Sequence, residues 1–368
     1  MINGIEKRLF VAATSQNDGK TTCTLGFLDA YREKAKSVGF IKPVGQRYVL
    51  VDGQTIDEDS VLVQRVCALR CPLKDMSPVA IERNFTRQFL DDPDGVAPGL
   101  VRSIRDSFAM AAKDNDMVVI EGTGHAGVGS VFDMSNARVA RMLNAKVIIV
   151  TLGGIGRPVD EVALNHNLFE SEHVEVVGVI ANKIQPEKLD QTREYLTKAF
   201  ARRGLALLGV LPYSRELTWP TVAQVAKAIR ATVVNGHQCL SNKIAEIVVG
   251  AMTAHNALKF IKDKALLIVP GDRDDVVLAA AASDLLRHDI DLSGIILTGG
   301  MHLAPQTREL IMRTHIPILT VEMPTYEATA LIHDITVKIL ESDEEKIALA
   351  TSMVRQYVDL DRLWDLLS

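Results

Sequence analysis

Short runs of consecutive apolar residues alternate along the first 215 residues with longer segments in which apolar residues recur at helical spacing. The short runs show no alternation of apolar and polar positions, which is typical of parallel strands buried on both faces. Strands that alternate with helices predict a doubly wound, mainly parallel α/β sheet. The expected strands span residues 8–13, 38–44, 117–122, 146–151, 174–182 and 205–212, and the expected helices include residues 20–36, 57–69, 99–113 and 186–203.

A second α/β series follows a break in this rhythm. Residues 216–242 contain a Trp-Pro pair and an Asn-Gly pair, which indicate a linker. Residues 343–368 predict a helical tail whose clustered apolar residues favour docking on the protein's own core over docking on a partner. The sequence therefore predicts a first domain over residues 1–215, the linker, a smaller α/β domain over residues 243–342, and the tail. The expected strands of the smaller domain span residues 245–252, 265–271, 294–300 and 317–323.

The composition is that of an ordinary globular protein. Of the 368 residues, 47% are hydrophobic and 24% are charged, which excludes a disordered chain. The formal net charge of −5 argues against a nucleic-acid partner, because phosphate binding normally leaves a basic footprint. No apolar run reaches the roughly 20 residues that span a bilayer, so no membrane segment is expected.

The four cysteines are expected to be reduced. Cys67 and Cys71 have helical spacing, but no second pair of Cys or His completes a zinc site. The charged N-terminus lacks the apolar core of a signal peptide. The sequence therefore predicts a cytoplasmic location.

The strongest chemical signal follows the first expected strand, where Gly-Lys-Thr-Thr begins a helix. This strand–loop–helix context is typical of a P-loop, in which backbone N–H groups and the helix N-terminus bind phosphate. Thr14 stands where the usual pattern has its first glycine. The alternative is a well-capped helix start without a ligand. The candidate nucleotide-binding residues here are Asn17, Asp18, Gly19, Lys20, Thr21 and Thr22.

Two acidic positions suit a magnesium ion beside that loop. Glu121 ends a buried strand, where a carboxylate can hold Mg²⁺ or its water. Asp59 begins a helix, where it can alternatively serve only to favour the helix dipole. With the Thr21 hydroxyl, these carboxylates give a set of hard oxygen ligands for a metal–triphosphate complex.

Six ordered motifs over residues 7–215 resemble dethiobiotin synthetase, and cobyrinic acid a,c-diamide synthase shares the same P-loop class. The whole chain is similar to the N-terminal part of long phosphotransacetylases, in which such a domain precedes a DRTGG domain. The acetyl-transferring domain is absent from this sequence. The motifs are Gly19-Lys20-Thr21-Thr22, Ile41-Lys42-Pro43-Val44, Glu58-Asp59-Ser60, Glu121-Gly122-Thr123-Gly124, Ala181-Asn182-Lys183 and Leu208-Gly209-Val210-Leu211-Pro212, with Pro270-Gly271-Asp272-Arg273-Asp274-Asp275 and Leu297-Thr298-Gly299-Gly300 in the second domain.

The resemblance implies ATP and Mg²⁺ as ligands, with Lys20 and Thr21 on phosphate and metal, and a homodimer. It makes Lys42 a second catalytic lysine that stabilises charge on a transferring phosphoryl group. It places Asn182 at the adenine edge and Pro212 beside the base pocket. The alternatives are a solvent-directed lysine at a strand end for Lys42 and a simple turn residue for Asn182.

The chain also departs from the dethiobiotin synthetase pattern. The usual Glu-Gly-Ala-Gly-Gly is Glu-Gly-Thr-Gly-His here, and the residues that bind the diamine substrate find no match. Biotin synthesis is therefore not expected. Gly124, Gly127 and Gly129 indicate either a flexible ligand loop or a structural turn.

In the second domain, several polar residues follow expected strands, where parallel strands would bring them to one crevice for a small anionic effector. The alternative is structural, with Asp272 capping its helix and Arg273 paired with Asp274 or a neighbour. The candidate effector residues are His255, Asp272, Arg273, Gly299, Gly300 and His302.

Two classes of function remain open. The first is a regulatory, ATP-binding and ATP-hydrolysing protein whose second domain binds an effector, related to phosphotransacetylase regulation. The second is an ATP-dependent ligase or synthetase acting on a small carboxylate or carbamate. The complete set of phosphate and metal residues favours chemistry, whereas the appended domain favours regulation.

Overall fold

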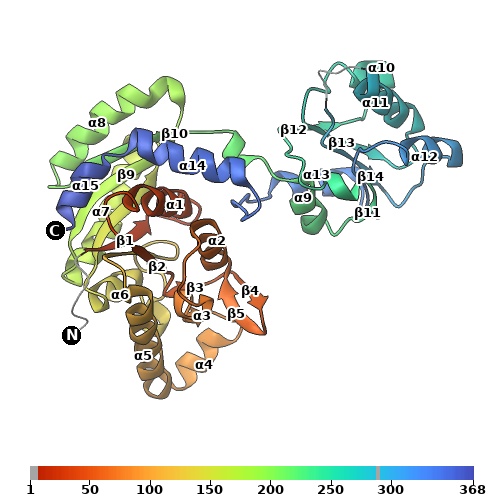
Figure 1. Ribbon diagram of the computed structural model, residues 1–368. Coiled ribbons are helices and arrows are strands. Elements are labelled where there is room, and N and C mark those ends of the chain that lie inside the picture. Colours follow the sequence, from red (N-terminus) through yellow and green to blue (C-terminus); the bar gives the residue numbers. More distant parts are fainter. Residues whose placement is uncertain (1–6, 287–290) are drawn as a thin grey trace. The chain divides into compact units, whose positions relative to one another are not determined.

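The computed structural model describes residues 7–286 and 291–368 of the chain. Its internal contacts divide it into two units, of which unit 1 comprises Met1–Ser214 and Ile339–Ser368 and unit 2 comprises Arg215–Lys338. Both units are α/β (Figure 1). Among the described residues, no helix is both long enough and apolar enough to cross a membrane.

Unit 1 is built on a six-stranded sheet in the order β10-β9-β8-β1-β7-β2, and every neighbouring pair is parallel. β1 lies at the point where the strand order reverses, since β7 flanks it on one side and β8 on the other. Ligands of open α/β sheets bind at this kind of switch point, outside the carboxyl ends of the strands. The strands are β1 (Lys7–Ala13), β2 (Val38–Ile41), β7 (Met117–Glu121), β8 (Lys146–Leu152), β9 (Val176–Ile184) and β10 (Leu207–Pro212).

Helices cover both faces of this sheet (Figure 1), as the buried apolar strands require. Two small accessory sheets, β3–β6 and the β4–β5 hairpin, were not expected from the sequence. The accessory strands are β3 (Val44–Gly45), β4 (Tyr48–Val51), β5 (Gln54–Asp57) and β6 (Val79–Ala80). The helices are α1 (Lys20–Tyr31), α2 (Glu58–Cys67), α3 (Leu73–Met76), α4 (Phe85–Asp91), α5 (Pro93–Ala112), α6 (Asn136–Met142), α7 (Gly156–Ser171), α8 (Leu189–Ala201), α14 (Glu344–Tyr357) and α15 (Leu360–Leu366), with short 3₁₀ turns at Ser130–Phe132 and Pro186–Lys188.

The C-terminal helices belong to unit 1, where they pack on the helix that follows the P-loop. Gly26 of α1 faces the fully buried Val354 of α14. At the surface, Arg355 donates to the carboxylates of Asp29 (2.6 Å) and Glu33 (2.8 Å). The expected docking of the tail on the protein's own core is therefore observed.

Unit 2 has a five-stranded sheet in the order β11-β15-β14-β13-β12, in which only β11 runs antiparallel to its neighbour. Separate apolar clusters pack on the two faces of this sheet. The strands are β11 (Thr232–Asn235), β12 (Glu246–Val249), β13 (Ala265–Pro270), β14 (Gly294–Thr298) and β15 (Ile318–Thr320). The helices are α9 (Val222–Ala228), α10 (Ala254–Ala257), α11 (Asp274–Leu286), α12 (Pro305–Ile311) and α13 (Thr325–His333), with 3₁₀ turns at Glu216–Thr218 and His237–Cys239.

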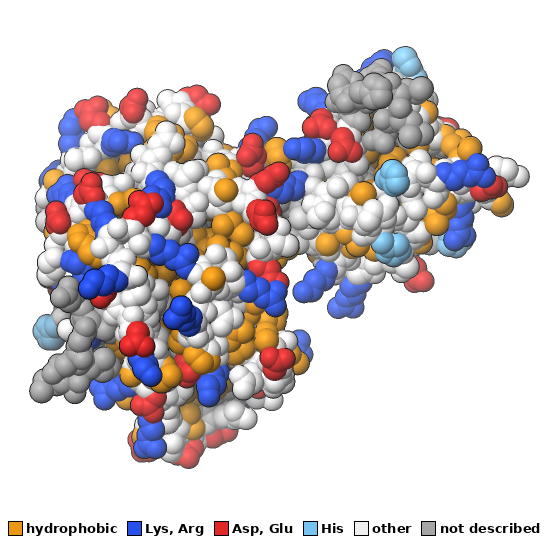
Figure 2. Space-filling view, viewed as in Figure 1, with side chains coloured by type: hydrophobic (Ala, Val, Ile, Leu, Met, Phe, Trp, Pro, Cys, Tyr) orange, Lys and Arg blue, Asp and Glu red, His pale blue; other side chains and the backbone are white. Residues whose placement is uncertain are grey.

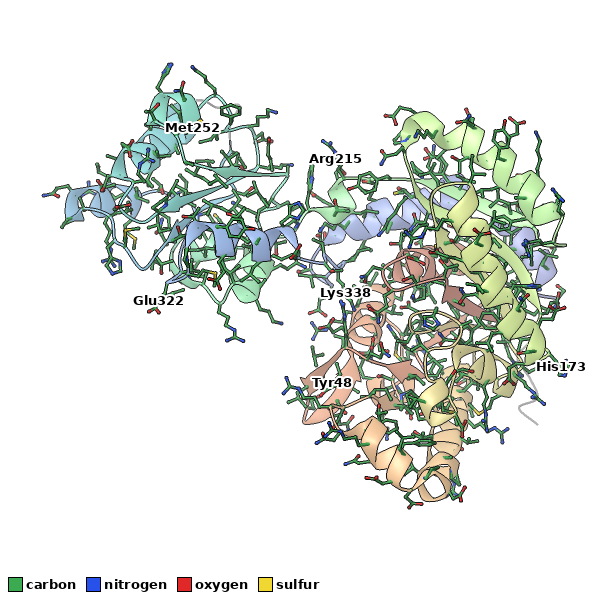
Figure 3. The ribbon with its side chains drawn as sticks, turned by 180° about the vertical axis from the view of Figure 1, so that it is seen from behind. Tyr48, His173, Arg215, Met252, Glu322 and Lys338 are labelled. Carbon is green, nitrogen blue, oxygen red and sulfur yellow. The ribbon has the colours of Figure 1, made fainter. Side chains whose placement is uncertain are left out.

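The expected linker over residues 216–242 is corrected by the structure, because this segment is a folded part of unit 2. Thr221 and Gln224 form a capping box at the start of α9. β11 pairs with β15, and the side-chain amide of Asn235 donates to three carbonyl oxygens of residues 311–316. Figure 3 labels Arg215 and Lys338, the first and last residues of the unit.

We expect Gly26→Ala to lower the free energy of unfolding of unit 1 by about 1–3 kcal/mol, the usual cost of overpacking a core. The added Cβ would overlap Val354 Cβ and lie 2.5 Å from its Cγ2, so one of the two helices must shift. Denaturant titration followed by circular dichroism measures this loss. Val354→Ala in the same chain should recover part of it, and simply additive costs of the two substitutions would contradict the packing described here.

Candidate functional site

The loop between β1 and α1 is held by one buried carboxylate. Asp18 Oδ2 accepts hydrogen bonds from the Ser15 N–H (2.6 Å) and from the Thr14 hydroxyl (2.8 Å). Asp18 is fully buried, and burial raises the pKa of its carboxyl group. The Thr14 N–H donates to the carbonyl of Val150 on β8 (2.9 Å). Thr14 thus forms the turn by hydrogen bonding where the common motif uses a glycine.

Gly19 is required where this loop enters α1. Its φ of +109° lies in the region that L side chains rarely adopt, and a Cβ there would overlap the side-chain nitrogen of Asn182. That amide nitrogen donates to the Asp18 carbonyl (2.8 Å), and Asn182 Oδ1 accepts from the Lys183 N–H (2.8 Å). Asn182 therefore supports the phosphate loop from the end of β9. Its expected contact with adenine stays a prediction.

The first turn of α1 presents the two residues expected to meet phosphate and metal. The Lys20 ammonium donates to the carbonyls of Ser15 (3.1 Å) and Gly124 (3.2 Å). Burial lowers the pKa of Lys20 below its usual value, and the nearby Glu121 carboxylate offsets only part of this change. The Thr21 hydroxyl donates to Glu121 Oε1 (3.1 Å). Gly19 provides no side-chain cap, so the helix N-terminus keeps its N–H groups available for an anion.

A buried lysine surrounded by carboxylates lies next to this turn. Lys42, which directly follows β2, forms ion pairs with Asp59, with Asp57 Oδ1 (3.2 Å) and with Glu121 Oε1 (3.3 Å). Burial alone lowers the pKa of Lys42, but the three carboxylates outweigh it and hold the pKa well above its usual value. Burial raises the pKa of Glu121, and Lys42 opposes that change. The alternative of a solvent-directed Lys42 does not hold in this structure.

The oxygen atoms at this point fit a magnesium ion. Glu121 Oε2 is buried and has no hydrogen-bond partner among the described residues. The Asp59 carboxylate, the same Glu121 carboxyl group and the Thr21 hydroxyl meet around one position at the carboxyl ends of β1, β2 and β7. Mg²⁺ prefers one or two carboxylates together with phosphate oxygens. In the described ranges no group of three or more His, Cys, Asp or Glu side chains forms a metal site by itself.

The other expected residues of unit 1 lie around this centre. Asn17 is exposed and in the left-handed region (φ 63°), with its carbonyl accepting from the Lys183 ammonium (2.7 Å). Thr22 is half-buried in α1, and Pro212 ends β10. The loop after β7 contacts the P-loop directly through the bond between Lys20 and the Gly124 carbonyl.

Sequence reasoning missed the part that Asp57 plays. Its side chain caps α2 by accepting from the Asp59 N–H (2.9 Å), and the same Oδ1 touches Lys42. The sequence showed only an acidic start to the helix. A capping Asp two residues before a candidate metal ligand was the signal that could have indicated a shared role.

In unit 2, Arg273 forms an ion pair with a neighbouring carboxylate, as the structural alternative expected. Its guanidinium forms a two-point ion pair with Asp275 (2.8 and 3.0 Å) and donates to the Met252 carbonyl (2.7 Å). The expected partner Asp274 instead accepts from the Ala304 N–H (2.9 Å). Asp272 is exposed.

The remaining candidate effector residues of unit 2 are exposed: His255 lies in the short helix α10, and the others lie in the loop after β14. His255, His302 and the glycines Gly299 and Gly300 are exposed, and both glycines have positive φ. Met252 and Glu322, labelled in Figure 3, mark two more loops at the carboxyl edge of the same sheet, because both follow parallel strands. The sequence predicted that these residues follow parallel strands at one edge of the sheet. The structure adds that the guanidinium group of Arg273 is already paired with Asp275.

The fold and the loop after β1 define a P-loop protein of the α/β class. The AAA domain family model matches residues 7–221, which is more than half of the chain, and the DRTGG domain model matches residues 224–335. The chain belongs to this AAA domain family and carries a DRTGG domain after it. The second match begins before the expected boundary at residue 243, in agreement with the folded segment described above.

Curated relatives extend the similarity over nearly the whole chain. The phosphate acetyltransferase of Pseudomonas aeruginosa is 27% identical and matches 96% of this chain but 51% of its own length. The phosphate acetyltransferase of Nitratidesulfovibrio vulgaris is 26% identical over 98% of this chain and 51% of its own length. The chain thus spans about half the length of the curated relatives it matches, which is consistent with the N-terminal region of long phosphotransacetylases.

Solved structures match part of this chain at low sequence identity. The septum site-determining protein MinD of Pyrococcus horikoshii, complexed with Mg-ADP, is 16% identical, with a TM-score of 0.34 over 57% of this chain and 83% of its own. A McdA–ATP complex from Cyanothece is 13% identical, with a TM-score of 0.37 over 58% of this chain and 86% of its own.

We expect Gly19→Ala to destabilise unit 1 by more than the roughly 1–2 kcal/mol that a left-handed backbone costs an alanine. The extra cost comes from the overlap with Asn182. Gly204→Ala is the matched control, because Gly204 has a φ of +72° and a Cβ added there would meet nothing within 4 Å. Equal losses in thermal unfolding for the two variants would contradict a close approach of Asn182 to the loop.

Proposed function

We propose that unit 1 binds ATP together with Mg²⁺ and hydrolyses it, and that unit 2 regulates this activity. The observation that carries the proposal is the convergence of two buried lysines, two buried carboxylates and a helix N-terminus at the switch point of the sheet. Membership of the AAA domain family supports a nucleotide as the ligand.

Lys20 and the first turn of α1 would bind the phosphates. The ammonium group now donates to two carbonyl groups of the surrounding loops, so phosphate oxygens would replace neutral acceptors with charged ones. The N–H groups of the loop and of the helix start complete the anion site. Asp18 and Asn182 fix the loop in the required shape before a ligand arrives.

Thr21, Asp59 and Glu121 would hold Mg²⁺. When bound, the ion would neutralise charge that develops on the phosphate oxygens. Lys42 would add a second positive charge on the same side, since its ammonium contacts both of those carboxylates. A lysine so placed stabilises a transferring phosphoryl group by electrostatic preorganisation.

The buried Lys42 also favours the second candidate function, an ATP-dependent ligase or synthetase acting on a small carboxylate or carbamate. A positive charge beyond the phosphate-loop lysine suits an acyl or carbamoyl phosphate as it forms. ATP turnover that requires such a metabolite would support the ligase, whereas turnover without it would support a regulatory ATPase.

The proposal extends to assembly, location and an effector. A homodimer would follow from the similarity to dethiobiotin synthetase, and light scattering across a range of concentrations tests it. A cytoplasmic location is supported by the free thiols of all four cysteines.

An effector at the carboxyl edge of unit 2 would have to compete with Asp275 for Arg273, or bind beside that pair. Basic and acidic side chains are interspersed on the face shown in Figure 2.

We expect ATP with Mg²⁺ to stabilise the protein by about 2.7 kcal/mol at 100 times its dissociation constant. A thermal-shift titration measures the gain, and Lys20→Ala should lose most of it, because the variant removes the charge that meets phosphate. Lys198→Ala is the control, since Lys198 is an exposed lysine paired with Glu194. An unchanged melting temperature at millimolar ATP with Mg²⁺ would refute the proposal.

We expect Glu121→Gln to keep the fold and to weaken the dependence of ATP binding on Mg²⁺. The amide keeps the shape of a side chain that is 1% exposed, but it removes the charge that attracts the ion. Calorimetric titration of ATP at several Mg²⁺ concentrations measures the effect. If Glu121→Gln unfolds the chain without ligand, the residue is primarily structural.

A further inference from the structure

Asp57 is a third carboxylate at Lys42 and has no part in the proposed metal site. Its side chain is 1% exposed, and its Oδ1 lies 3.2 Å from the Lys42 ammonium. The other two carboxylates at Lys42 are Asp59 and Glu121. These two are also the acidic residues that would hold Mg²⁺, so two cations share them.

Because Mg²⁺ would use two of these carboxylates, Lys42 needs a third one to hold it. If Asp59 and Glu121 turned to Mg²⁺, Lys42 would share two of the three carboxylates that now surround it with the metal ion. An ammonium group that is buried without a partner is strongly unfavourable. Of the three carboxylates at Lys42, Asp57 is the one outside the proposed ligand set, and it can keep the ammonium group in place.

The surroundings of Asp57 fix the position of its carboxylate. Oδ1 accepts the Asp59 N–H (2.9 Å) as the cap of α2, and the backbone N–H of Asp57 donates to Ser77 Oγ (2.9 Å). On the other side, a Cβ at Gly45 would lie 2.6 Å from Asp57 Oδ2, so a residue with a side chain would displace the carboxylate. The Lys42 backbone is fixed as well, since its N–H donates to the Met76 carbonyl (2.8 Å).

We propose that Asp57 is a positioning residue that retains the Lys42 ammonium at the phosphate site while Asp59 and Glu121 hold Mg²⁺. The inference rests on the proposed function of unit 1 and adds a role for a residue outside its ligand set. Because the same oxygen caps α2, Asp57 also links the place of Lys42 to the helix that carries Asp59.

A substitution can separate the two roles of Asp57. Asparagine caps helices about as well as aspartate, so Asp57→Asn keeps the cap and removes the charge. The measured quantity is the gain in affinity for a non-hydrolysable ATP analogue when Mg²⁺ is added, obtained by calorimetry on the full chain. Asp92→Asn is the matched control, because Asp92 caps α5 through the Gly95 N–H (3.0 Å) away from Lys42.

We expect Asp57→Asn to reduce the Mg²⁺-dependent gain by about tenfold, the size of a typical coupling between contacting charges. Affinity without Mg²⁺ should change by less than about threefold, because Asp59 and Glu121 then still hold Lys42. Asp92→Asn should leave both values unchanged. A gain that is unaltered in Asp57→Asn would overturn the proposal.

A double-mutant cycle shows whether Asp57 acts through Lys42. In a Lys42→Met background, Asp57→Asn should have almost no further effect on the Mg²⁺-dependent gain, since the group that it positions is gone. The same loss in both backgrounds would mean that Asp57 acts on the metal directly, and would overturn the inference. Absence of nucleotide binding by the wild-type chain would instead overturn the proposed function, and this inference with it.

Stability is the remaining control. Thermal unfolding without ligand should place Asp57→Asn close to the wild type. If Asp57→Asn fails to fold, Asp57→Ser, which also keeps a capping oxygen, takes its place in the cycle. Failure of both variants to fold would make Asp57 a structural residue and would overturn the proposal.

Discussion

The buried ion cluster around Lys42 is the interaction on which the rest of the site depends. One ammonium group joins carboxylates from three separate elements, at the end of β5, in the first turn of α2 and at the end of β7. Buried ion pairs add little net stability, but an ammonium group left with no carboxylate partner would be a costly buried charge. The cluster therefore fixes the position of each member more than it strengthens the fold. Thr21 joins it through Glu121, and α1 is connected to it in this way.

α1 is held from its other side by the C-terminal helices. Unit 2 is inserted between β10 and α14, so the chain leaves unit 1 at one edge of the sheet and returns on the helix that contacts α1. The P-loop helix is thus packed between the candidate site and the segment that follows unit 2. The chain leads directly from the end of unit 2 at Lys338 to α14. In the proposed function, this connection is the path by which a change in unit 2 would act on unit 1.

Much of the fold could be predicted from the sequence because it depends on local patterns. Buried parallel strands appear as unbroken apolar runs, and the observed β1, β8 and β13 differ from the expected ranges by at most a residue at either end. The strand–loop–helix context also predicted a helix that begins at Lys20, as α1 does. The linker prediction failed because β11 is a four-residue strand that is only partly buried, and its pairing with the distant β15 leaves no local signal.

The sequence could indicate which residues are candidates for the site, but not which of them contact one another. Lys42, Asp59 and Glu121 were each placed near phosphate or metal, but their mutual ion pairs depend on how β2, α2 and β7 approach one another. Asp57 was missed because the sequence showed only an acidic start to the helix, whereas its ion pair with Lys42 depends on how the end of β5 approaches the end of β2. The contact of Asn182 with adenine stays a prediction. What the sequence did not show is that its amide also lies under the P-loop, where the absence of a side chain at Gly19 leaves room for it.

A crystal structure of the full chain with a non-hydrolysable ATP analogue and Mn²⁺, whose anomalous scattering identifies the metal, tests the central claim most directly. The account predicts an anomalous peak within coordination distance of Thr21, Asp59 and Glu121. It also predicts that Lys20 has left the carbonyls of Ser15 and Gly124 for the phosphate oxygens. A nucleotide bound elsewhere, or a phosphate at the loop with the metal away from both carboxylates, would contradict it.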